Sequence, residues 1–322
     1  MRAIVITEYG GPEVLAIAEL PDPVPAEGEV LIRVHAFGLN HAETYFRSGA
    51  WGDVAKVTGI ECAGTVEGGA LPVGTRVVAI LGGMGRTRNG SYAELVTVPA
   101  SNVAQVDVDL PWPVLAAVPE VYATAWTGLR DNLDLQAGQT VLVRGATSAL
   151  GQAAVGIAAD LGATVLATTR NPDRATFLRD RGASEVMIDD GNLAVRLQTR
   201  MDAVLDLVGN ATLRDSLACA RPRGRVAQLG FLGGLEPVKD FNPLTDLPTG
   251  VQLSFYGGPF VLGGPDYPLT DVPLDGIFAK VADGTFHARP VRVFSFDQIV
   301  EAHRVMESGT AGGKMVVTVD PS

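Results

Sequence analysis

Residues 141–151, which read VLVRGATSALG, constrain the fold more than any other segment of this chain. An apolar run at 141–143 leads through a turn of small residues into a stretch, GQAAVGIAADLG, that is apolar on nearly every face of a helix. A buried strand followed by a buried helix is typical of a parallel sheet covered on both faces. Small residues in the turn let backbone N–H groups approach an anion at the helix N-terminus, where the helix dipole favours negative charge. The pattern predicts a pyrophosphate site over residues 145–151, with a plain strand-to-helix turn as the alternative.

The continuation of the pattern favours the pyrophosphate site. Apolar strands are predicted at 140–143, 163–168, 185–188, 203–208 and 225–230, with helices at 172–181 and 211–220 and an edge strand at 251–256. Asn171 can cap the helix at 172–181, Pro172 suits its first position, and Gly182 can end it. Strands that alternate with helices form βαβ units, so we expect a doubly wound, dinucleotide-binding domain over 118–258.

The first part of the chain has a different pattern of predicted secondary structure. Short β segments are predicted at 2–6, 14–19, 29–37, 63–67, 76–80 and 92–98, separated by turns rich in Gly and Pro. Such spacing indicates a small barrel or sandwich over 1–117. The tail, 259–322, has one amphipathic helix at 296–307 and a strand at 315–319, which is too little for a third domain. We therefore expect the tail to complete the first domain, giving an α/β protein with two domains.

Composition excludes several classes of protein. The chain has 322 residues, two cysteines and a formal net charge of -11. Two cysteines cannot build a disulfide framework or a multi-cysteine zinc site. A net-acidic chain without a basic stripe is a poor nucleic-acid binder. Because the sequence has no apolar run long enough to span a membrane and no signal-peptide pattern at its start, we expect a cytoplasmic protein with no membrane or nucleic-acid partner.

The end of the second predicted strand of the dinucleotide-binding domain bears on the choice of cofactor. An acidic side chain at this point binds the ribose 2′-hydroxyl of NAD, whereas an arginine suits the 2′-phosphate of NADP. The sequence has Thr169 and Arg170 there, with Arg174 one helical turn further on. We therefore expect NADPH; the alternative is that both arginines are solvated surface charges.

Eight segments together carry a family resemblance that covers almost the whole chain. They are 38–49 (GLNHAETYFRSG), 59–66 (GIECAGTV), 73–77 (VGTRV), 90–99 (GSYAELVTVP), 122–129 (YATAWTGL), 137–170, 204–209 (VLDLVG) and 301–317 (EAHRVMESGTAGGKMVV). In this order they resemble the zinc-free quinone oxidoreductases of the medium-chain dehydrogenase/reductase superfamily. The resemblance implies a GroES-like β-barrel catalytic domain, an inserted Rossmann domain, a C-terminal return and a homodimer.

The resemblance also bears on zinc. Zinc-dependent relatives have a cysteine where this chain has Asn40, a histidine where it has Ile60, and a four-cysteine lobe that this chain lacks. His41 is adjacent to Asn40, but a catalytic zinc needs about three protein ligands. We therefore expect no metal site.

The chain departs from the family at two points near the predicted cofactor. The family usually has glycine where Ser148 stands, so the loop would approach the phosphate less closely unless the Ser148 hydroxyl acts as a donor. A tyrosine that often contacts the 2′-phosphate is missing near Asp189, and the pair Asp189 and Asp190 would disfavour a phosphate if it points inward.

The expected site residues follow from the loop pattern and the resemblance. Tyr45 is the candidate hydrogen-bond donor to the acceptor oxygen, with a pocket-lining role as the alternative, and Asn40 is the candidate partner of substrate or cofactor ribose. His41 is a further candidate for contact with substrate. The expected cofactor contacts are Thr124, Gly145, Thr147, Ser148, Ala149, Leu150, Gly151, Thr169, Arg170, Arg174, Val208, Gly230 and Phe231.

The sequence therefore predicts an NADPH-dependent, zinc-independent reductase that transfers hydride to a quinone or an α,β-unsaturated carbonyl compound. One alternative is an enoyl-thioester or alkenal reductase. A second is a protein that binds NADPH without turnover, like relatives recruited as lens crystallins.

Overall fold

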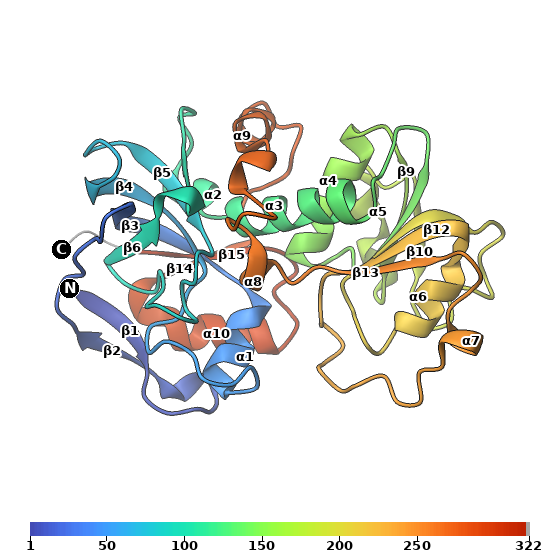
Figure 1. Ribbon diagram of the computed structural model, residues 1–322, viewed down its shortest axis with the longest axis horizontal. Coiled ribbons are helices and arrows are strands. Elements are labelled where there is room, and N and C mark those ends of the chain that lie inside the picture. Colours follow the sequence, from blue (N-terminus) through green and yellow to red (C-terminus); the bar gives the residue numbers. More distant parts are fainter. Residues whose placement is uncertain (320–322) are drawn as a thin grey trace. The chain divides into compact units, whose positions relative to one another are not determined.

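The computed structural model describes residues 1–319, and the chain divides into two compact units. One consists of Met1–Ala123 and Gly258–Ser322, and the other of Thr124–Gly257 (Figure 1). The division lies inside helix α3 (Pro119–Thr127), not at the predicted junction of residues 117 and 118. The segment from Gly258 lies in the same unit as the N-terminal segment.

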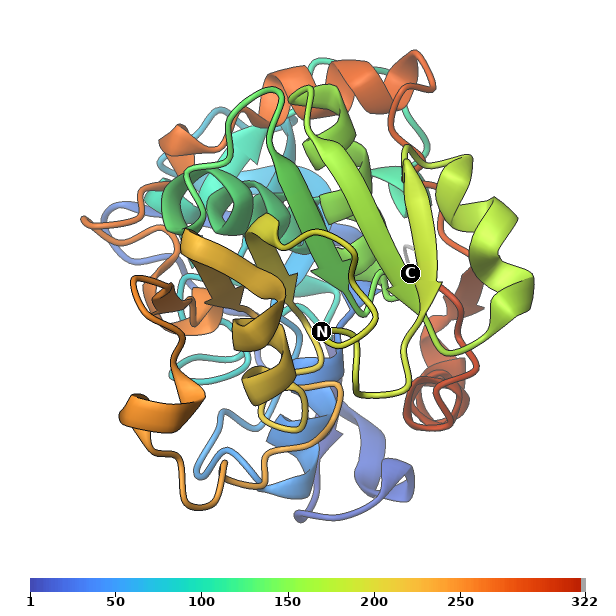
Figure 2. The ribbon, with the colours of Figure 1, turned by 90° about the vertical axis from the view of Figure 1, so that its right-hand side faces the viewer.

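The unit Thr124–Gly257 is built on one parallel sheet, whose strands lie side by side in Figure 2. The strands are β8 (Thr140–Arg144), β9 (Thr164–Thr169), β10 (Glu185–Ile188), β11 (Met201–Asp206), β12 (Ala220–Gln228) and β13 (Gln252–Phe255). Their spatial order is β10-β9-β8-β11-β12-β13, and every neighbouring pair is parallel. This is the doubly wound order, which reverses between β8 and β11. Ligands of such sheets bind outside the carboxyl ends of the strands at that reversal.

Helices connect these strands in the way the sequence predicts. They are α4 (Ala149–Asp160), α5 (Ala175–Arg179), α6 (Leu213–Cys219) and α7 (Pro243–Asp246), with a π-helical turn at Gly128–Asn132 and a 3-10 turn at Pro172–Arg174. The predicted helix at 172–181 thus begins as a 3-10 turn. Asn171 caps it, because its side chain accepts a hydrogen bond of 2.9 Å from the Asp173 amide.

The other unit is mainly β. A seven-stranded sheet consists of β3 (Glu29–Leu39), β4 (Glu61–Gly69), β5 (Arg76–Ile80), β6 (Leu95–Pro99), β7 (Val103–Gln105), β14 (Arg292–Ser295) and β15 (Met315–Thr318). A two-stranded ribbon consists of β1 (Arg2–Ile6) and β2 (Leu15–Glu19). Strand β15 pairs antiparallel with β3, so the C-terminal segment completes the sheet begun by the N-terminal one.

Short helices surround this sheet. They are α1 (His41–Ser48), α2 (Trp112–Leu115), α8 (Gly258–Val261), α9 (Leu274–Ala282) and α10 (Ile299–Glu307), with 3-10 turns at Pro12–Val14, Ala100–Asn102, Leu269–Asp271 and Phe296–Gln298. The predicted helix at 296–307 is therefore a 3-10 turn that continues into α10.

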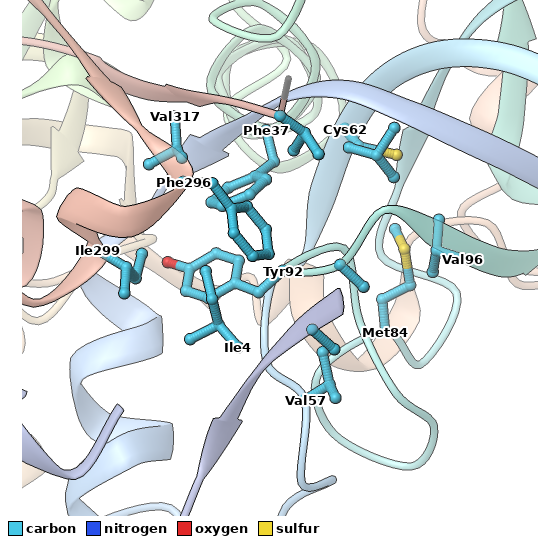
Figure 3. Packing of buried hydrophobic residues seen from close by; sticks show 14 of the residues in the cluster. Ile4, Phe37, Val57, Cys62, Met84, Tyr92, Val96, Phe296, Ile299 and Val317 are labelled. Carbon is cyan, nitrogen blue, oxygen red and sulfur yellow. The ribbon is translucent and has the colours of Figure 1, made fainter. Parts of the chain in front are cut away.

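The core of this unit is aromatic at its centre (Figure 3). The ring of Phe37 stacks on Tyr92 with centroids 4.4 Å apart, and Phe296 meets Phe37 edge-on at 6.4 Å. Phe37 lies on β3 and Phe296 in the turn before α10, so the core joins the two ends of the chain. In Figure 3 the Tyr92 hydroxyl lies on the side of Ile299, at the start of α10.

None of the helices within residues 1–319 is long and apolar enough to span a membrane.

Candidate functional site

The loop after β8 holds the start of helix α4 close against the strand end. Gly145 has φ +80, a left-handed conformation that favours glycine. A Cβ on Gly151 would lie 2.4 Å from the Gly145 carbonyl oxygen, so only glycine lets the helix approach this closely. Ser148 caps α4, because its hydroxyl accepts a hydrogen bond of 3.0 Å from the Gly151 amide and donates one of 2.8 Å to the Gly145 carbonyl.

The exposed part of the same loop fits a pyrophosphate. Thr147, Ser148, Ala149 and Leu150 are all partly accessible to solvent at the N-terminus of α4. An anion there would meet free backbone N–H groups and the positive end of the helix dipole. The Ser148 hydroxyl hydrogen is engaged by Gly145, so Ser148 braces the loop rather than offering an unoccupied donor.

The carboxyl end of β9 places a cation beside this loop. Thr169 is buried, and Arg170 is exposed and makes no hydrogen bond or ion pair with any residue in 1–319. Arg174 lies over the Phe177 ring at 3.7 Å. The Thr168 hydroxyl accepts a hydrogen bond of 3.2 Å from the Gly145 amide, which ties the end of β9 to the loop.

Asp189 is held by a buried arginine. Arg144, at the end of β8, is fully buried and donates two hydrogen bonds to the Asp189 carboxylate, at 2.7 and 2.8 Å. Burial opposes ionisation of Asp189, but the hydrogen bonds from Arg144, the Gly191 amide and Thr168, together with the charge of Arg144, outweigh it and the pKa of Asp189 is lowered. Asp190 is exposed and pairs with Arg196 through one contact of 2.7 Å. Each carboxylate of this pair thus has a cation of its own.

Arg144 also ties the strand ends to helix α6. Its second terminal nitrogen lies 2.9 Å from the Asp215 carboxylate and donates to the Ser216 hydroxyl at 3.0 Å. Ser216 in turn donates to Asp206 at the end of β11, at 2.5 Å. We call Arg144, Asp189, Asp206, Asp215 and Ser216 the strand-end cluster.

Asp206 of the strand-end cluster orders the loop that follows β11. Its carboxylate accepts hydrogen bonds from the amides of Val208 at 2.8 Å and Gly209 at 2.9 Å. At the next strand end, a Cβ on Gly230 would lie 2.5 Å from the Leu207 carbonyl oxygen, and Phe231 packs near Phe255. The predicted cofactor residues of this unit, from 145 to 231, therefore lie along the carboxyl edge of one sheet. Thr124 is buried in α3, at the first position of the unit.

In the other unit, helix α1 presents the two candidate catalytic residues. Asn40 stands at its N-cap, and Tyr45 lies one turn along, beside His41, with ring centroids 5.1 Å apart. Tyr45 also stacks on Trp51, at 5.8 Å. Burial raises the pKa of Tyr45, so its hydroxyl stays protonated at neutral pH.

The side chain of Asn40 contacts two buried ions. Its amide nitrogen donates to Glu61 at 2.9 Å, and its carbonyl oxygen accepts from the Lys314 ammonium at 2.6 Å. Lys314 also pairs directly with the same Glu61 oxygen, and the other oxygen of Glu61 accepts from the Glu120 amide at 2.8 Å. We call Asn40, Glu61 and Lys314 the Asn40 clamp.

A second buried group supports the start of α1. The Glu43 carboxylate accepts hydrogen bonds from the Asn40 amide at 2.8 Å, the Ile60 amide at 3.1 Å and the Tyr92 hydroxyl at 2.7 Å. Burial raises the pKa of Glu43 to about 7, against the hydrogen bond from Tyr92. His303 on α10 contacts the same hydroxyl at 3.1 Å, and burial lowers its pKa to about 3.

Sequence reasoning missed Glu43, Glu61, Tyr92, His303 and Lys314. Two of them carried a signal. Glu61 interrupts an apolar segment, GIECAGTV, and Lys314 immediately precedes the apolar strand MVVT. A charged residue inside or beside a buried strand needs a partner, but the sequence alone does not say which one.

The residues near Asn40 do not fit a catalytic zinc. Ile60 is buried and has no metal-binding side chain. In the described part of the chain, residues 1–319, no group of three or more His, Cys, Asp or Glu side chains could hold a metal ion. Both cysteines are buried, and burial raises the pKa of each thiol to about 12.

Comparison with known proteins agrees with this architecture. A family model described as "Zinc-binding dehydrogenase" matches residues 181–317, and one described as "Alcohol dehydrogenase GroES-like domain" matches residues 26–108. A mycobacterial protein solved in complex with NADPH is 30% identical, with a TM-score of 0.87 and 99% of each chain covered.

Two curated relatives are also similar. A human quinone oxidoreductase is 31% identical over 252 residues, which cover 73% of this chain and 75% of that protein. A polyketide synthase of Streptomyces halstedii is 33% identical over 308 residues, which cover 92% of this chain but only 5% of the synthase. With its GroES-like unit and its Rossmann unit, the chain belongs to the quinone oxidoreductase family of the medium-chain dehydrogenase/reductase superfamily and is an oxidoreductase that uses a nicotinamide cofactor.

Proposed function

We propose that this protein is an NADPH-dependent, zinc-independent reductase that transfers hydride to a quinone or an α,β-unsaturated carbonyl compound. The preference for NADPH is carried by one observation: the carboxyl end of β9 bears an exposed Arg170 and no carboxylate. The nearby Asp189 does not contradict this, because Arg144 holds its carboxylate in a two-bonded ion pair. A mycobacterial relative solved with NADPH supports the same choice.

In this proposal the unit Thr124–Gly257 binds the cofactor, and the other unit supplies hydrogen-bond donors to the acceptor. The backbone of 145–151 holds the pyrophosphate, Arg170 binds the 2′-phosphate with help from Arg174, and Val208, Gly230 and Phe231 line the adenosine and nicotinamide path. When bound, the cofactor supplies the hydride. The Tyr45 hydroxyl donates a hydrogen bond to the acceptor oxygen as negative charge develops there, and Asn40 donates a second from its amide nitrogen.

Substitution of Arg170 tests the cofactor assignment. We expect Arg170→Ala to weaken NADPH binding about tenfold and to leave NADH binding unchanged, because a charge-assisted contact to the 2′-phosphate is worth about 1.5 kcal/mol. Arg179→Ala, at an exposed position on α5, is the matched control. Cofactor fluorescence titrations give both dissociation constants. Equal affinity for NADPH and NADH in the wild type would refute the preference.

Turnover assays test the acceptor class. We expect NADPH oxidation with quinones and enones at the same rate with and without a chelator. Saturable NADPH binding without turnover on this panel would favour the alternative of a non-catalytic NADPH-binding protein. A loss of activity on chelation would refute zinc independence.

An enoyl-thioester or alkenal reductase is the second candidate. The matched segment of a polyketide synthase favours it, since that relative covers 92% of this chain. The two candidates differ in the acceptor they reduce fastest. Higher kcat/KM for enoyl thioesters or alkenals than for benzoquinones would favour the second.

We further propose a cytoplasmic homodimer. Strand β13 lies at the edge of its sheet, and Leu253 and Phe255 on it are 42% and 58% exposed. An exposed apolar edge strand is a template for pairing with another chain. A monomer in sedimentation velocity at micromolar concentration would refute the dimer.

Both cysteines are free and buried, as expected of a reducing compartment.

A further inference from the structure

We propose that Lys314 and Glu61 are positioning residues that fix the Asn40 carboxamide in one orientation and thereby set the rate of hydride transfer. This inference rests on the proposed function, in which the Asn40 amide nitrogen donates to the substrate. It assigns a role to two buried ions that the proposed chemistry does not otherwise use.

The contacts of the Asn40 clamp leave the carboxamide little freedom. Lys314 donates to its oxygen at 2.6 Å, and Glu61 accepts from its nitrogen at 2.9 Å. A lysine ammonium can only donate and an ionised carboxylate can only accept. A flipped amide would set two donors against each other at Lys314 and two acceptors against each other at Glu61. The clamp therefore selects one orientation, and one N–H bond of the Asn40 nitrogen is left to donate elsewhere.

The clamp is itself fixed by the protein around it. Glu61 is fully buried and its second oxygen accepts from the Glu120 amide at the start of α3, at 2.8 Å. Lys314 is 7% exposed and lies at the start of β15, whose pairing with β3 holds it opposite Asn40. Two charges taken out of water at this depth cost stability unless their geometry is good. A role in function explains why they are buried here better than a role in stability does.

Space for the clamp is provided by one glycine. A Cβ on Gly38 would lie 2.2 Å from the Glu61 carboxylate oxygen and 2.7 Å from Cε of Lys314. Both distances are shorter than real Cβ contacts allow, so any side chain at position 38 must displace the ion pair. Gly38 faces Val316 across the β3–β15 pairing. Gly38 lies two positions before Asn40 in the chain, and Val316 lies two positions after Lys314. The absence of a side chain at Gly38 thus leaves the space that the ion pair occupies.

Kinetics of a double-mutant cycle test the role of Lys314. We expect Lys314→Met to lower kcat about tenfold and to change the NADPH dissociation constant less than twofold. In an Asn40→Ala background the same substitution should have no further effect, because Lys314 acts through Asn40. Lys314→Arg should recover part of the activity. Equal losses in both backgrounds would overturn the inference and leave the proposed function intact.

Two further variants keep the test decisive. If Lys314→Met fails to fold, Lys314→Met combined with Glu61→Gln removes both buried charges and should fold with the same loss of kcat. Gly38→Ala should also reproduce the loss. Gly68→Ala, on β4 with no atom within 4 Å of its added Cβ, is the matched control and should not.

A spectroscopic measurement separates this inference from the proposed function. In protein labelled with 15N-asparagine, the side-chain signal of Asn40 is identified by its loss in Asn40→Ala. We expect Lys314→Met to shift that signal and Lys280→Met, on α9, to leave it in place. This holds even if no acceptor is turned over, in which case the proposed function fails while the clamp stands. An unshifted signal in Lys314→Met would overturn the inference.

Discussion

The two units bury their ions in different ways. In the unit Thr124–Gly257, the strand-end cluster draws its members from residues 144–216, and they meet at the carboxyl ends of neighbouring parallel strands. In the other unit, the Asn40 clamp joins residues as far apart as Asn40 and Lys314, which are separated by 274 positions. The first arrangement is set by the order of strands in one sheet, and the second by the return of the C-terminal strand to β3.

The difference teaches what each unit contributes. The strand-end cluster supports loops that would hold a cofactor through their backbone, so its ions brace the chain and need not touch a ligand. The Asn40 clamp holds a side chain that is itself a candidate donor. We therefore expect defects of the first cluster to appear as lost stability or cofactor affinity. Defects of the second should appear as lost turnover in addition to lost stability, because removal of Lys314 leaves the Glu61 carboxylate buried without its cation.

The largest effect should come from breaking the strand-end cluster. Arg144→Met removes a fully buried cation and leaves the partly buried carboxylates of Asp189 and Asp215 without it, so we expect the free energy of unfolding to fall by about 3 kcal/mol. Arg196→Met breaks the exposed pair with Asp190 and should cost less than about 1 kcal/mol. Denaturant unfolding of the two variants measures the contrast. Similar losses of unfolding free energy in both variants would show that burial of Arg144 does not increase its contribution to stability.

A smaller effect is expected at the loop itself. Gly151→Ala places a Cβ against backbone atoms of Gly145 and Ala146, at 2.4 and 2.6 Å, so the loop must shift away from the helix. We expect the NADPH dissociation constant to rise at least about tenfold, which corresponds to about 1.4 kcal/mol. Gly276→Ala, in helix α9 with no atom within 4 Å of the new Cβ, should leave the dissociation constant unchanged. An unchanged constant in Gly151→Ala would argue against a backbone-held pyrophosphate.

A third contrast between the two units is a difference in pH dependence. The pKa of Glu43 is raised from 4.5 to about 7, so the folded protein keeps a proton that the unfolded chain has lost in that window. Stability from this group is present below pH 4.5 and falls as the pH rises to 7, by at most about 1.4 kcal/mol per pH unit. Asp189 contributes no slope there, since its pKa is lowered from 3.8.

Glu43→Gln checks this expectation. The difference in unfolding free energy between wild type and variant should fall between pH 5 and 7 and then level off. His303 has the opposite slope, because its pKa is lowered from 6.5 to about 3 and stability from it is lost on acidification through that range. The comparison with Glu43→Gln isolates Glu43, since His303 is common to both proteins. A difference that is constant with pH would show that Glu43 stays ionised.

Much of the fold could be predicted because its pattern is local. The doubly wound sheet, its edge strand β13, the helix cap at Asn171 and the helix at 296–307 all follow from runs of residues within one or two elements. The contacts divide the chain inside helix α3, six residues from the predicted junction of residues 117 and 118. A helix within an apolar region gives no sequence signal for the residue at which its contacts pass from one unit to the other.

The candidate site divides along the same line. The sequence by itself determined the glycine-bearing loop at 145–151 and the arginine after β9, because backbone approach and charge at a strand end depend on neighbours in the chain. It also raised the question of Asp189, which only the tertiary structure answered, by placing the Arg144 guanidinium against it.

Tertiary structure alone decided the surroundings of Asn40. Glu61 and Lys314 are buried ions that need partners, but a charge can be satisfied by any opposite charge that the fold brings near. The pairing of β15 with β3, and the space left over Gly38, chose those partners from opposite ends of the chain. A buried charge requires a partner of opposite charge, which the residue type alone shows. The pairing of β15 with β3 determines which residue becomes that partner.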